Sequence, residues 1–256
     1  MSARTWKLLI LAGLSVPMLS GVAALGPVAQ PLDYHAFADQ RGIAGIPHFW
    51  NVASNLPFAV VGATGIWWLA QSKRRREVVQ SGEWNMYLVF FAGGMLTSLG
   101  SAYYHSAPSN PTLVWDRLVF SLMLTSFFAI VISEFVSPLT ARGLLVPMIV
   151  AGVGSVIYWS WTESTGRGDL RPYLVVQFYP VILIPVIALL FKPRYASSRF
   201  LLAAWGLYAV AKVCELADPA IFDLTGFWSG HTLKHLIAAL ASYLPLRGLM
   251  ERWRWR

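Results

Sequence analysis

The sequence is short of charged residues and has almost no cysteine, and both shortages narrow the classes of protein that it can be. Aspartate, glutamate, lysine and arginine make up 12% of the 256 residues, about half of what soluble globular domains carry. An ordinary soluble domain is therefore excluded. The one cysteine, Cys214, rules out an intrachain disulfide and a thiolate metal cluster. Its position inside an apolar run indicates a packing residue.

Apolar residues are correspondingly abundant, at 56% of the chain, and they include 12 tryptophans and 14 phenylalanines. They form runs of roughly 20 residues, the length that an α-helix needs to cross a bilayer. We therefore predict an all-α integral membrane protein, with a seven-transmembrane-helix bundle as its core and an extra apolar helix at its N-terminus. The runs lie at 6–27, 51–71, 84–105, 112–136, 143–161, 172–191, 199–217 and 229–248.

The first apolar run can be interpreted in two ways. Arg4 and Lys7 precede it and Gly21-Val-Ala-Ala24 ends it, which is the pattern of a cleaved signal peptide. Pro17 and the length of the run also permit a retained transmembrane helix. Residues 1–30 are accordingly predicted to be an N-terminal apolar helix or signal sequence, residues 31–250 the seven-helix domain, and residues 251–256 a basic cytoplasmic tail.

The basic residues predict how the chain is oriented in the membrane. The net charge is +8, but the lysines and arginines lie between apolar runs rather than on one continuous face. We therefore interpret them as topology signals and expect no nucleic-acid partner. Loops rich in lysine and arginine face the cytoplasm, and with eight spans both ends of the chain lie there. The cytoplasmic set comprises Arg4, Lys7, Lys73 to Arg76, Arg142, Lys192, Arg194, Arg199, Arg247, Arg252, Arg254 and Arg256.

Polar residues gather where one predicted helix ends and the next begins. Ser101 and His105 are four residues apart, so they share one face of the earlier helix. Asp116 lies in the first turns of the next helix, which Asn110 is placed to cap and Pro111 to start. Asp116 is therefore expected to return to the depth of Ser101 and His105.

A second pair of histidines, His231 and His235, is also four residues apart, at the start of the last apolar run. The predicted topology brings this pair to the same, non-cytoplasmic end of the bundle as His105. Three neutral imidazoles with one open position are typical of catalytic zinc, which supplies hydroxide by lowering the pKa of its water to about 7. Asp116 can orient or deprotonate that water, and Ser101 can bond a developing oxyanion. The implied reaction is hydrolysis of an amide or ester in a membrane molecule.

Each of these residues also has an ordinary structural interpretation. A lone membrane histidine is more often an interhelical hydrogen-bonding group, Asp116 can pair with the neighbouring Arg117, and Ser101 can be a small packing residue. Ionisable residues inside membrane helices are nevertheless rare and usually functional. Their convergence at metal-ligand spacing therefore favours a metal site.

At these residues the chain resembles the alkaline ceramidases, part of a wider group of seven-helix hydrolases that includes the adiponectin receptors. That family has Ser-x-x-x-His at the end of its second core helix, an aspartate eleven residues later and His-x-x-x-His in its last helix. Ser101-Ala-Tyr-Tyr-His105, Asp116 and His231-Thr-Leu-Lys-His235 match in order and spacing. Phe49-Trp-Asn-Val-Ala-Ser-Asn55 is similar to the segment that opens the family's first core helix. The resemblance covers roughly residues 33–250.

The resemblance implies a zinc ion held by His105, His231 and His235, with Ser101 and Asp116 as catalytic residues beside it. It also implies that the substrate is a membrane lipid, ceramide, whose N-acyl bond is hydrolysed to a sphingoid base and a free fatty acid.

One part of the family pattern is different in this chain. Animal members carry an acidic calcium cluster before the first core helix, whereas here the loop reads Asp33-Tyr-His-Ala-Phe-Ala-Asp39 and His48 stands where a glutamate is expected. The resemblance therefore does not carry a calcium site over to this chain. A second metal site that uses Asp33, His35, Asp39 or His48 is left open.

Three rival functions are also left open. The zinc site can act on another lipid amide or an ester; zinc can be structural in a receptor-like or transport protein; or paired histidines can hold haem. An open zinc position beside Asp116 argues against a structural metal, and two histidines on one helix face argue against haem. The absence of an N-glycosylation sequon and of a retention signal favours a bacterial inner membrane, and the sequence gives no signal for an oligomeric state.

Overall fold

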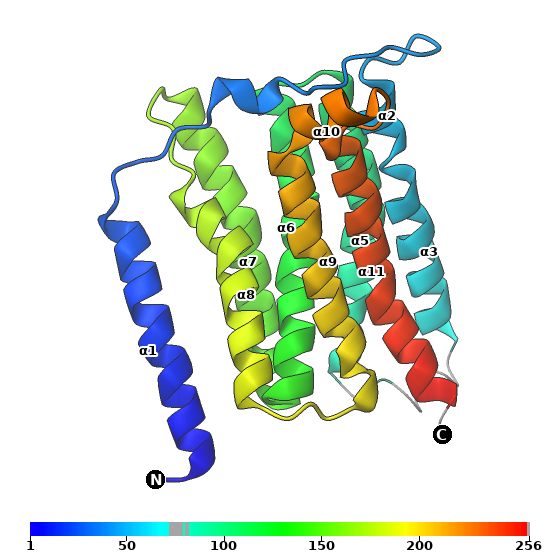
Figure 1. Ribbon diagram of the computed structural model, residues 1–256. Coiled ribbons are helices and arrows are strands. Elements are labelled where there is room, and N and C mark those ends of the chain that lie inside the picture. The colour runs from blue at the N-terminus through cyan, green and yellow to red at the C-terminus, as the bar shows by residue number, and fades with distance from the viewer. Residues whose placement is uncertain (72–78, 80–81, 255–256) are drawn as a thin grey trace.

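The protein is built from helices joined by loops (Figure 1). The structure is a computed structural model that describes residues 1–71, 79 and 82–254. Within that part of the chain, the only extended pairing is an isolated antiparallel bridge between Ile43 and Ile46. The helices are α1 (Ala3–Ala24), η1 (Leu32–His35), α2 (Phe49–Ala53), α3 (Leu56–Ala70), α5 (Glu83–Ser106), α6 (Asn110–Phe135), α7 (Pro138–Ser164), α8 (Arg171–Leu190), η2 (Ala196–Ser198), α9 (Arg199–Leu216), α10 (Asp218–Thr225) and α11 (Gly230–Arg254).

The prediction of an all-α membrane protein with several spans is confirmed. Among the described residues, 6 helices are long and apolar enough to cross a membrane, with α2 and α3 counted as one span from Phe49 to Ala70. The count rises to 7 if α9 and α10, which are bent by 77° at their junction, form one span. Helix α11 is 25 residues long and runs beside α9 in the bundle, but His231, Lys234 and His235 make it less apolar than the others.

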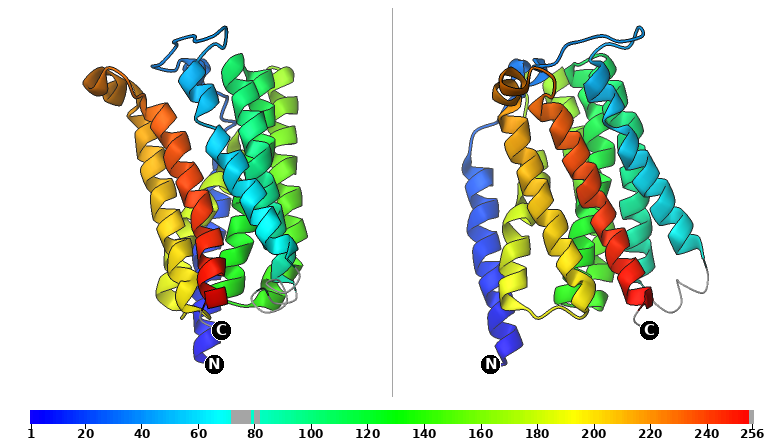
Figure 2. Two further views of the ribbon diagram at one scale, coloured as in Figure 1. Left: turned by 90° about the vertical axis from the view of Figure 1, so that its right-hand side faces the viewer. Right: turned by 45° about the vertical axis from the view of Figure 1, so that its right-hand side comes forward.

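The long helices run side by side, and the short helix α10 bends away from α9 and projects outward at one end of the bundle (Figure 2). Helix α1 stands at the edge of the bundle next to α8, and none of its residues is buried. A hydroxyl contact of 2.7 Å between Ser15 of α1 and Tyr179 of α8 links the two helices. An apolar helix of this kind is expected both for a retained transmembrane span and for a signal peptide before its cleavage, so the choice between them remains a prediction.

The start of α6 differs from the sequence prediction in one detail. The N-cap is Ser109, whose hydroxyl forms a capping box with Thr112, and Asn110 is the first helical residue rather than the cap. Ser109 takes this role because its backbone is extended, as an N-cap requires, and its side chain accepts from the Thr112 N–H. The Asn110 side chain is thereby free to bond elsewhere. Its Oδ1 lies 2.9 Å from His35 Nε2, and its Nδ2 donates to the Glu163 carboxylate at 3.1 Å.

The two chain ends lie at the same end of the bundle, and α2, α10 and the first turns of α11 lie at the opposite end (Figure 1). The first turns of α7, with Arg142, and the loop after α8, with Lys192 and Arg194, lie at the end with the termini. This alternation agrees with the predicted sidedness of the basic loops, although which side faces the cytoplasm remains a prediction. The run from Lys73 to Arg76 and the final Arg256 lie outside the described residues.

The end of the bundle that carries the termini contains a buried ionic network. Glu134 of α6 is fully buried and pairs with Arg252 of α11. It also accepts hydrogen bonds of 2.5 Å from Tyr87 and from Ser198. Residues 251–254 belong to α11, and Arg252 is an interior residue that ties α11 to α6.

Candidate metal centre

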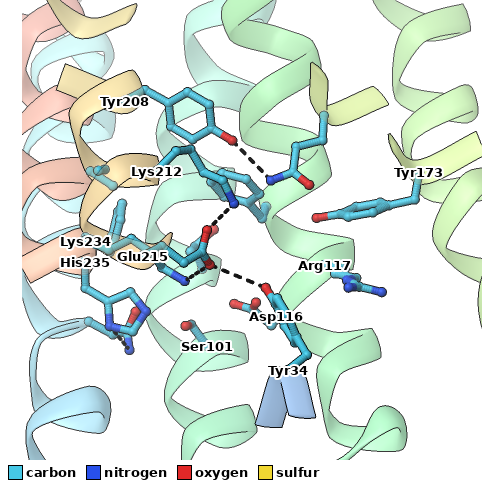
Figure 3. Close-up of a pocket in the computed structure, with 17 residues that line it drawn as sticks. Tyr34, Ser101, Asp116, Arg117, Tyr173, Tyr208, Lys212, Glu215, Lys234 and His235 are labelled. Atoms are coloured by element: carbon cyan, nitrogen blue, oxygen red, sulfur yellow. Dashed lines mark hydrogen bonds and ion pairs between the residues drawn. The ribbon is translucent and has the colours of Figure 1, made fainter. Parts of the chain in front are cut away.

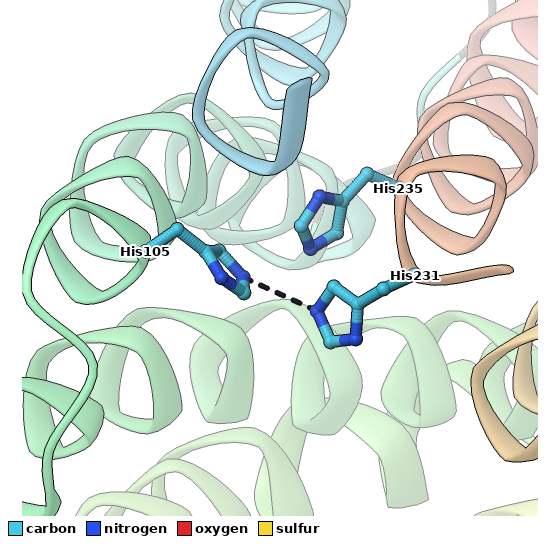
Figure 4. Close-up of side chains that lie close together, drawn as sticks. All are labelled: His105, His231 and His235. Carbon is cyan, nitrogen blue, oxygen red and sulfur yellow. Dashed lines mark hydrogen bonds between the residues drawn. The ribbon is translucent and has the colours of Figure 1, made fainter. Parts of the chain in front are cut away.

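Three histidines meet inside the bundle (Figure 4), at the end opposite the termini, where α11 starts (Figure 1). His105 comes from the last turn of α5, and His231 and His235 come from successive turns at the start of α11. One ring nitrogen from each lies within 4.8 Å of the others, and all three residues are buried. His105 Nε2 and His231 Nε2 are 3.2 Å apart. The sequence prediction that these residues converge is confirmed.

The donor set of this triad fits a metal ion. Nitrogen ligands at 2.0–2.1 Å from a tetrahedral zinc lie about 3.3 Å from one another, close to the 3.2 Å between the His105 and His231 nitrogens. An ion that binds between the rings would satisfy nitrogens that otherwise face each other. The triad can therefore hold a metal ion.

The start of α11 is held tightly against the junction of α9 and α10, and this contact positions the two α11 histidines. Gly230 lies so close to that junction that a Cβ atom would be 2.2 Å from the Cys214 carbonyl oxygen. The Asp218 carboxylate accepts from the His231 N–H at 2.7 Å, and the Ser229 hydroxyl accepts from the Thr232 N–H at 3.0 Å. These groups satisfy the free N–H groups of the first helical turn.

The segment Phe49–Asn55 supports the triad from the side of α2. Ser54 Oγ lies 2.8 Å from His235 Nδ1 and donates to the Asn51 carbonyl oxygen at 3.3 Å. When Nδ1–H donates to Ser54, the Nε2 lone pair of His235 is left for a metal, as is usual for metal-binding histidines. Asn51 Oδ1 accepts from the Thr232 hydroxyl at 3.0 Å, which ties the segment to α11. The sequence resemblance had singled out this segment without giving it a role.

Phe37, in the loop between η1 and α2, covers the triad. Its ring centroid is 4.7 Å from that of His105 and 4.5 Å from that of His231, and the residue is buried. The backbone N–H of Ala38 donates to Asp218 at 2.9 Å, which fastens the loop. Sequence reasoning missed Phe37, because nothing distinguishes it from the other 13 of the 14 phenylalanines.

Ser101 and Asp116 line a cavity that adjoins the triad at His235 (Figure 3). Gly100 allows this arrangement, since a Cβ atom at that position would lie 2.7 Å from the carbonyl oxygen of Trp115. Helices α5 and α6 are thus in close contact at the residues just before Ser101 and Asp116. Asp116 was predicted to lie at the depth of Ser101, and in the structure the two residues line the same cavity.

The same cavity contains three charged residues that sequence reasoning did not select. Glu215 of α9 pairs with Lys234 of α11 at 2.8 Å and with Lys212 of its own helix (Figure 3). Lys234 Nζ is also 3.0 Å from His231 Nε2. All three lie in predicted apolar runs, where an ionisable residue is itself a signal of function. That signal was present in the sequence but did not indicate which residues would meet.

Arg117 does not form the ion pair with Asp116 that one interpretation of the sequence allowed. No contact between their charged groups occurs among the salt bridges of the described residues. The Arg117 guanidinium instead lies over the ring of Trp159, at 4.2 Å from its centroid, and donates to Gln30 at 2.5 Å. The Asp116 carboxylate is therefore not paired with Arg117, and Asp116 lines the cavity together with Ser101.

His35 and Asp39, two of the residues considered for a second metal site, have other partners in the loop before α2. His35 lies between Tyr104 and Asn110, with each ring nitrogen 2.9 Å from its partner. Asp39 is paired with Arg41 at 2.8 Å; burial opposes its ionisation, but the hydrogen bonds and charge of Arg41 prevail and lower its pKa. Of the residues that the structure describes, only the triad forms a group of three or more such ligands close enough to share an ion.

Comparison with known proteins assigns no family: no family model matches the chain, and no curated protein is significantly similar to it. The fold and the site themselves define a multi-pass helical membrane protein with a buried three-histidine cluster.

Proposed function

We propose that the protein is a zinc-dependent hydrolase of the membrane that cleaves the N-acyl bond of ceramide or a closely similar lipid amide. The observation that carries this proposal is the position of Ser101 and Asp116 in one cavity with His235, next to the three-histidine cluster. A structural metal has no need of a carboxylate and a hydroxyl beside it, whereas hydrolysis needs both a proton carrier and an oxyanion donor.

Zinc is the metal that suits this donor set best. Three imidazoles and no thiolate or carboxylate ligand match the three-ligand sites of zinc hydrolases. When bound, zinc supplies Lewis acidity and a water that ionises near neutral pH. His105, His231 and His235 would hold it, with Ser54 fixing the ring of His235.

The catalytic steps fall to Asp116 and Ser101. Asp116 accepts the proton of the attacking water and returns it to the amine that leaves, so it serves first as base and then as acid. Ser101 donates its hydroxyl hydrogen to the oxyanion that forms when the carbonyl is attacked. Both residues line the cavity that adjoins His235, so both are available to one bound substrate.

The surroundings of the cavity support a lipid substrate. A second cavity, with an apolar lining that includes Phe90, Met123 and Trp205, shares Tyr208 and Ala238 with the first. A hydrocarbon chain suits this second cavity, while the polar first cavity suits a head with hydroxyl and amide groups. The resemblance of the motifs to those of alkaline ceramidases supports ceramide as the particular lipid.

The test joins metal analysis to product detection. Purified protein should contain about one zinc per chain, and the variant with His105, His231 and His235 all replaced by alanine should contain almost none. The wild type should release fatty acid and sphingoid base from micellar ceramide, and a chelator should stop the release. Full zinc in the triple variant would refute the metal site, and loaded wild type that releases no product would refute the ceramidase assignment.

Two further variants test the mechanism. Asp116→Asn should keep zinc and fold but hydrolyse ceramide at least ~100-fold more slowly, the usual scale for loss of acid–base help. Ser101→Ala should also keep zinc, with a loss on the order of 10–100-fold because the metal shares the stabilisation of the oxyanion. Turnover that is unchanged in Asp116→Asn would contradict the mechanism and leave the metal site intact.

A further inference from the structure

A polar atom of one residue that lines the cavity beside the triad has no hydrogen-bond partner in the described part of the chain. Asn55 is 1% exposed and lines the cavity together with Ser101, Asp116 and His235. Its Nδ2 donates to the Asn51 carbonyl oxygen at 2.7 Å, but its Oδ1 is buried and accepts no hydrogen bond from any described residue. The bond to Asn51 fixes which way the amide points, because a carbonyl oxygen can accept only from the NH₂ end. Oδ1 is therefore a fixed, unused acceptor.

An unused acceptor in such a place is costly, at roughly 1–3 kcal/mol for a buried group of this kind. Other side chains of the same wall are already bonded: Thr97, for example, donates to the Gly93 carbonyl oxygen at 2.8 Å. Ser101 and Asp116 have tasks in the proposed reaction. Oδ1 of Asn55 thus lacks a donor, and a substrate is one source of such a donor.

The scissile group of an amide carries a suitable donor, whereas that of an ester does not. In a secondary amide the N–H is bonded directly to the carbonyl carbon that is attacked. In an ester of the same shape, an oxygen with lone pairs stands in that place. A carbonyl oxygen that lines the cavity therefore stabilises a bound amide and repels a bound ester. Sites that hydrogen-bond a substrate N–H discriminate strongly against an analogue without that N–H.

We propose that Oδ1 of Asn55 accepts the N–H of the scissile bond and makes the site selective for secondary amides over esters. This inference rests on the proposed function, which places the scissile bond beside Ser101 and Asp116. It adds a specificity-determining residue to that function and narrows the substrate class, since the zinc centre alone would accept either kind of bond.

Two substitutions separate the acceptor from the neighbouring donor. Asn55→Ala removes Oδ1 together with Nδ2, while Asn55→Asp keeps an oxygen acceptor and removes only Nδ2. Thr97→Val is the matched control, because it removes a buried hydroxyl of the same wall that is already bonded within its own helix. Each variant is tested with ceramide and with the analogue that has oxygen in place of the amide nitrogen, and kcat/KM is measured for both.

Asn55→Ala should lower the ratio of amide to ester hydrolysis by roughly 10–100-fold, mainly through loss on the amide. Asn55→Asp and Thr97→Val should keep the ratio within a few-fold of the wild type. A second measurement needs no turnover: chelator-treated protein should bind ceramide on the order of 10-fold more tightly than N-methyl ceramide, as judged by displacement of a fluorescent lipid. Asn55→Ala should abolish that difference.

Equal losses on amide and ester in Asn55→Ala, or a ratio that falls as far in Asn55→Asp, would assign Asn55 a structural role and overturn the inference. So would equal binding of ceramide and N-methyl ceramide by the wild type. If the wild type hydrolyses neither compound, the proposed function fails instead. The binding comparison still decides whether Asn55 accepts a hydrogen bond from the amide N–H.

Discussion

The three histidines differ in how completely their rings are held. His235 has Ser54 at its Nδ1, 2.8 Å away, whereas the Nδ1 of His105 has no partner among the described residues. A hydrogen bond on the second nitrogen fixes both the tautomer and the orientation of a ligand ring. His235 is therefore the histidine whose ring is already oriented for metal binding, and Ser54 is the residue that orients it.

Replacement of Ser54 by alanine should weaken metal binding by roughly 10–100-fold, the usual cost of losing such a partner. Ser54→Thr keeps the hydroxyl and should retain most of the affinity. Ser126→Ala is the control, since Ser126 is also buried but bonds only to carbonyl oxygens of its own helix. Competition with a calibrated chelator measures the affinities. Equal affinity in Ser54→Ala and the wild type would show that His235 needs no support from α2.

At the residue scale, the sequence predicted the convergence of the three histidines better than it predicted their surroundings. His105, His231 and His235 were predictable because i, i+4 spacing places pairs of side chains on one helix face, and the basic loops gave their common depth. Phe37 and the pairing of Glu215 with Lys234 were not predictable. Their contacts depend on how α9 faces α11 and on how a loop folds back, and neither follows from periodicity.

At the scale of helices, the close approach of α11 to the α9–α10 junction sets the height of two ligands. Gly230 is the point of contact, and a Cβ atom there would also lie 2.7 Å from the Cα atom of Asp218. Both nearby groups are backbone, which cannot rotate away as a side chain can. A larger residue must therefore displace the first turn of α11, which carries His231.

Gly230→Ala should consequently lower the free energy of unfolding by roughly 1–3 kcal/mol, the usual cost of overpacking, and should weaken metal binding as well. Gly206→Ala is the matched control, because Gly206 of α9 has no atom within 4 Å of the position that its Cβ would take. Thermal unfolding in detergent and metal analysis of both variants test this. A Gly230→Ala protein with wild-type stability and metal content would contradict the role given to this contact.

The long helices were predictable and the short ones were not. Long apolar runs identify spans through their length, whereas α10 has only 8 residues and η1 only 4. Their formation depends on contacts with other parts of the chain, such as that between Asp218 and the start of α11. These short elements carry or flank the loops that cover the site. The residues that cover the site could therefore not be predicted from the sequence.

The loop between α7 and α8 ties the chain that follows α1 to the bundle. Asp169 is paired with Arg171 at 2.7 Å, and Arg171 also donates to the Leu25 carbonyl oxygen. Hydrogen bonds from Arg171 are the main cause that lowers the pKa of Asp169 to about 2; burial opposes them, and a bond from Tyr158 adds to them. The ordinary value is about 3.9, so the folded protein holds this carboxylate in its charged form.

Because the folded pKa of Asp169 is the lower one, its contribution to stability is complete above about pH 4 and is lost as the pH falls toward 2. The unfolding temperature of the wild type should fall over this window more steeply than that of Asp169→Asn. At neutral pH, Asp169→Asn should be the less stable of the two. Asp223→Asn, at an exposed aspartate of α10, serves as control. Parallel curves for the wild type and Asp169→Asn would contradict the assigned role.

At the scale of the whole molecule, two polar regions lie at opposite ends of an apolar bundle. The triad and its cavity lie away from the termini, and the buried pair of Glu134 and Arg252 lies near them. Removal of one partner of a buried ion pair is far more costly than the pair itself is stabilising. We therefore interpret the pair of Glu134 and Arg252 as a structural contact that holds α11 against α6, and the triad with its cavity as the functional region.

The arrangement of the termini and the site predicts which side of the membrane each one faces. The basic loops at the end of the termini are expected to be cytoplasmic, so the end that carries Ser109 and Phe227 should face the other side. Single cysteines placed at these two positions in a Cys214→Ala background should react with a membrane-impermeant thiol reagent added outside intact cells. A cysteine in place of Lys192, an exposed residue at the opposite end, should react only after the cells are opened, and a reporter fused after Arg256 should be cytoplasmic. The reverse pattern of labelling would invert the topology and move the proposed hydrolysis to the cytoplasmic side, whereas the metal site itself would be unaffected.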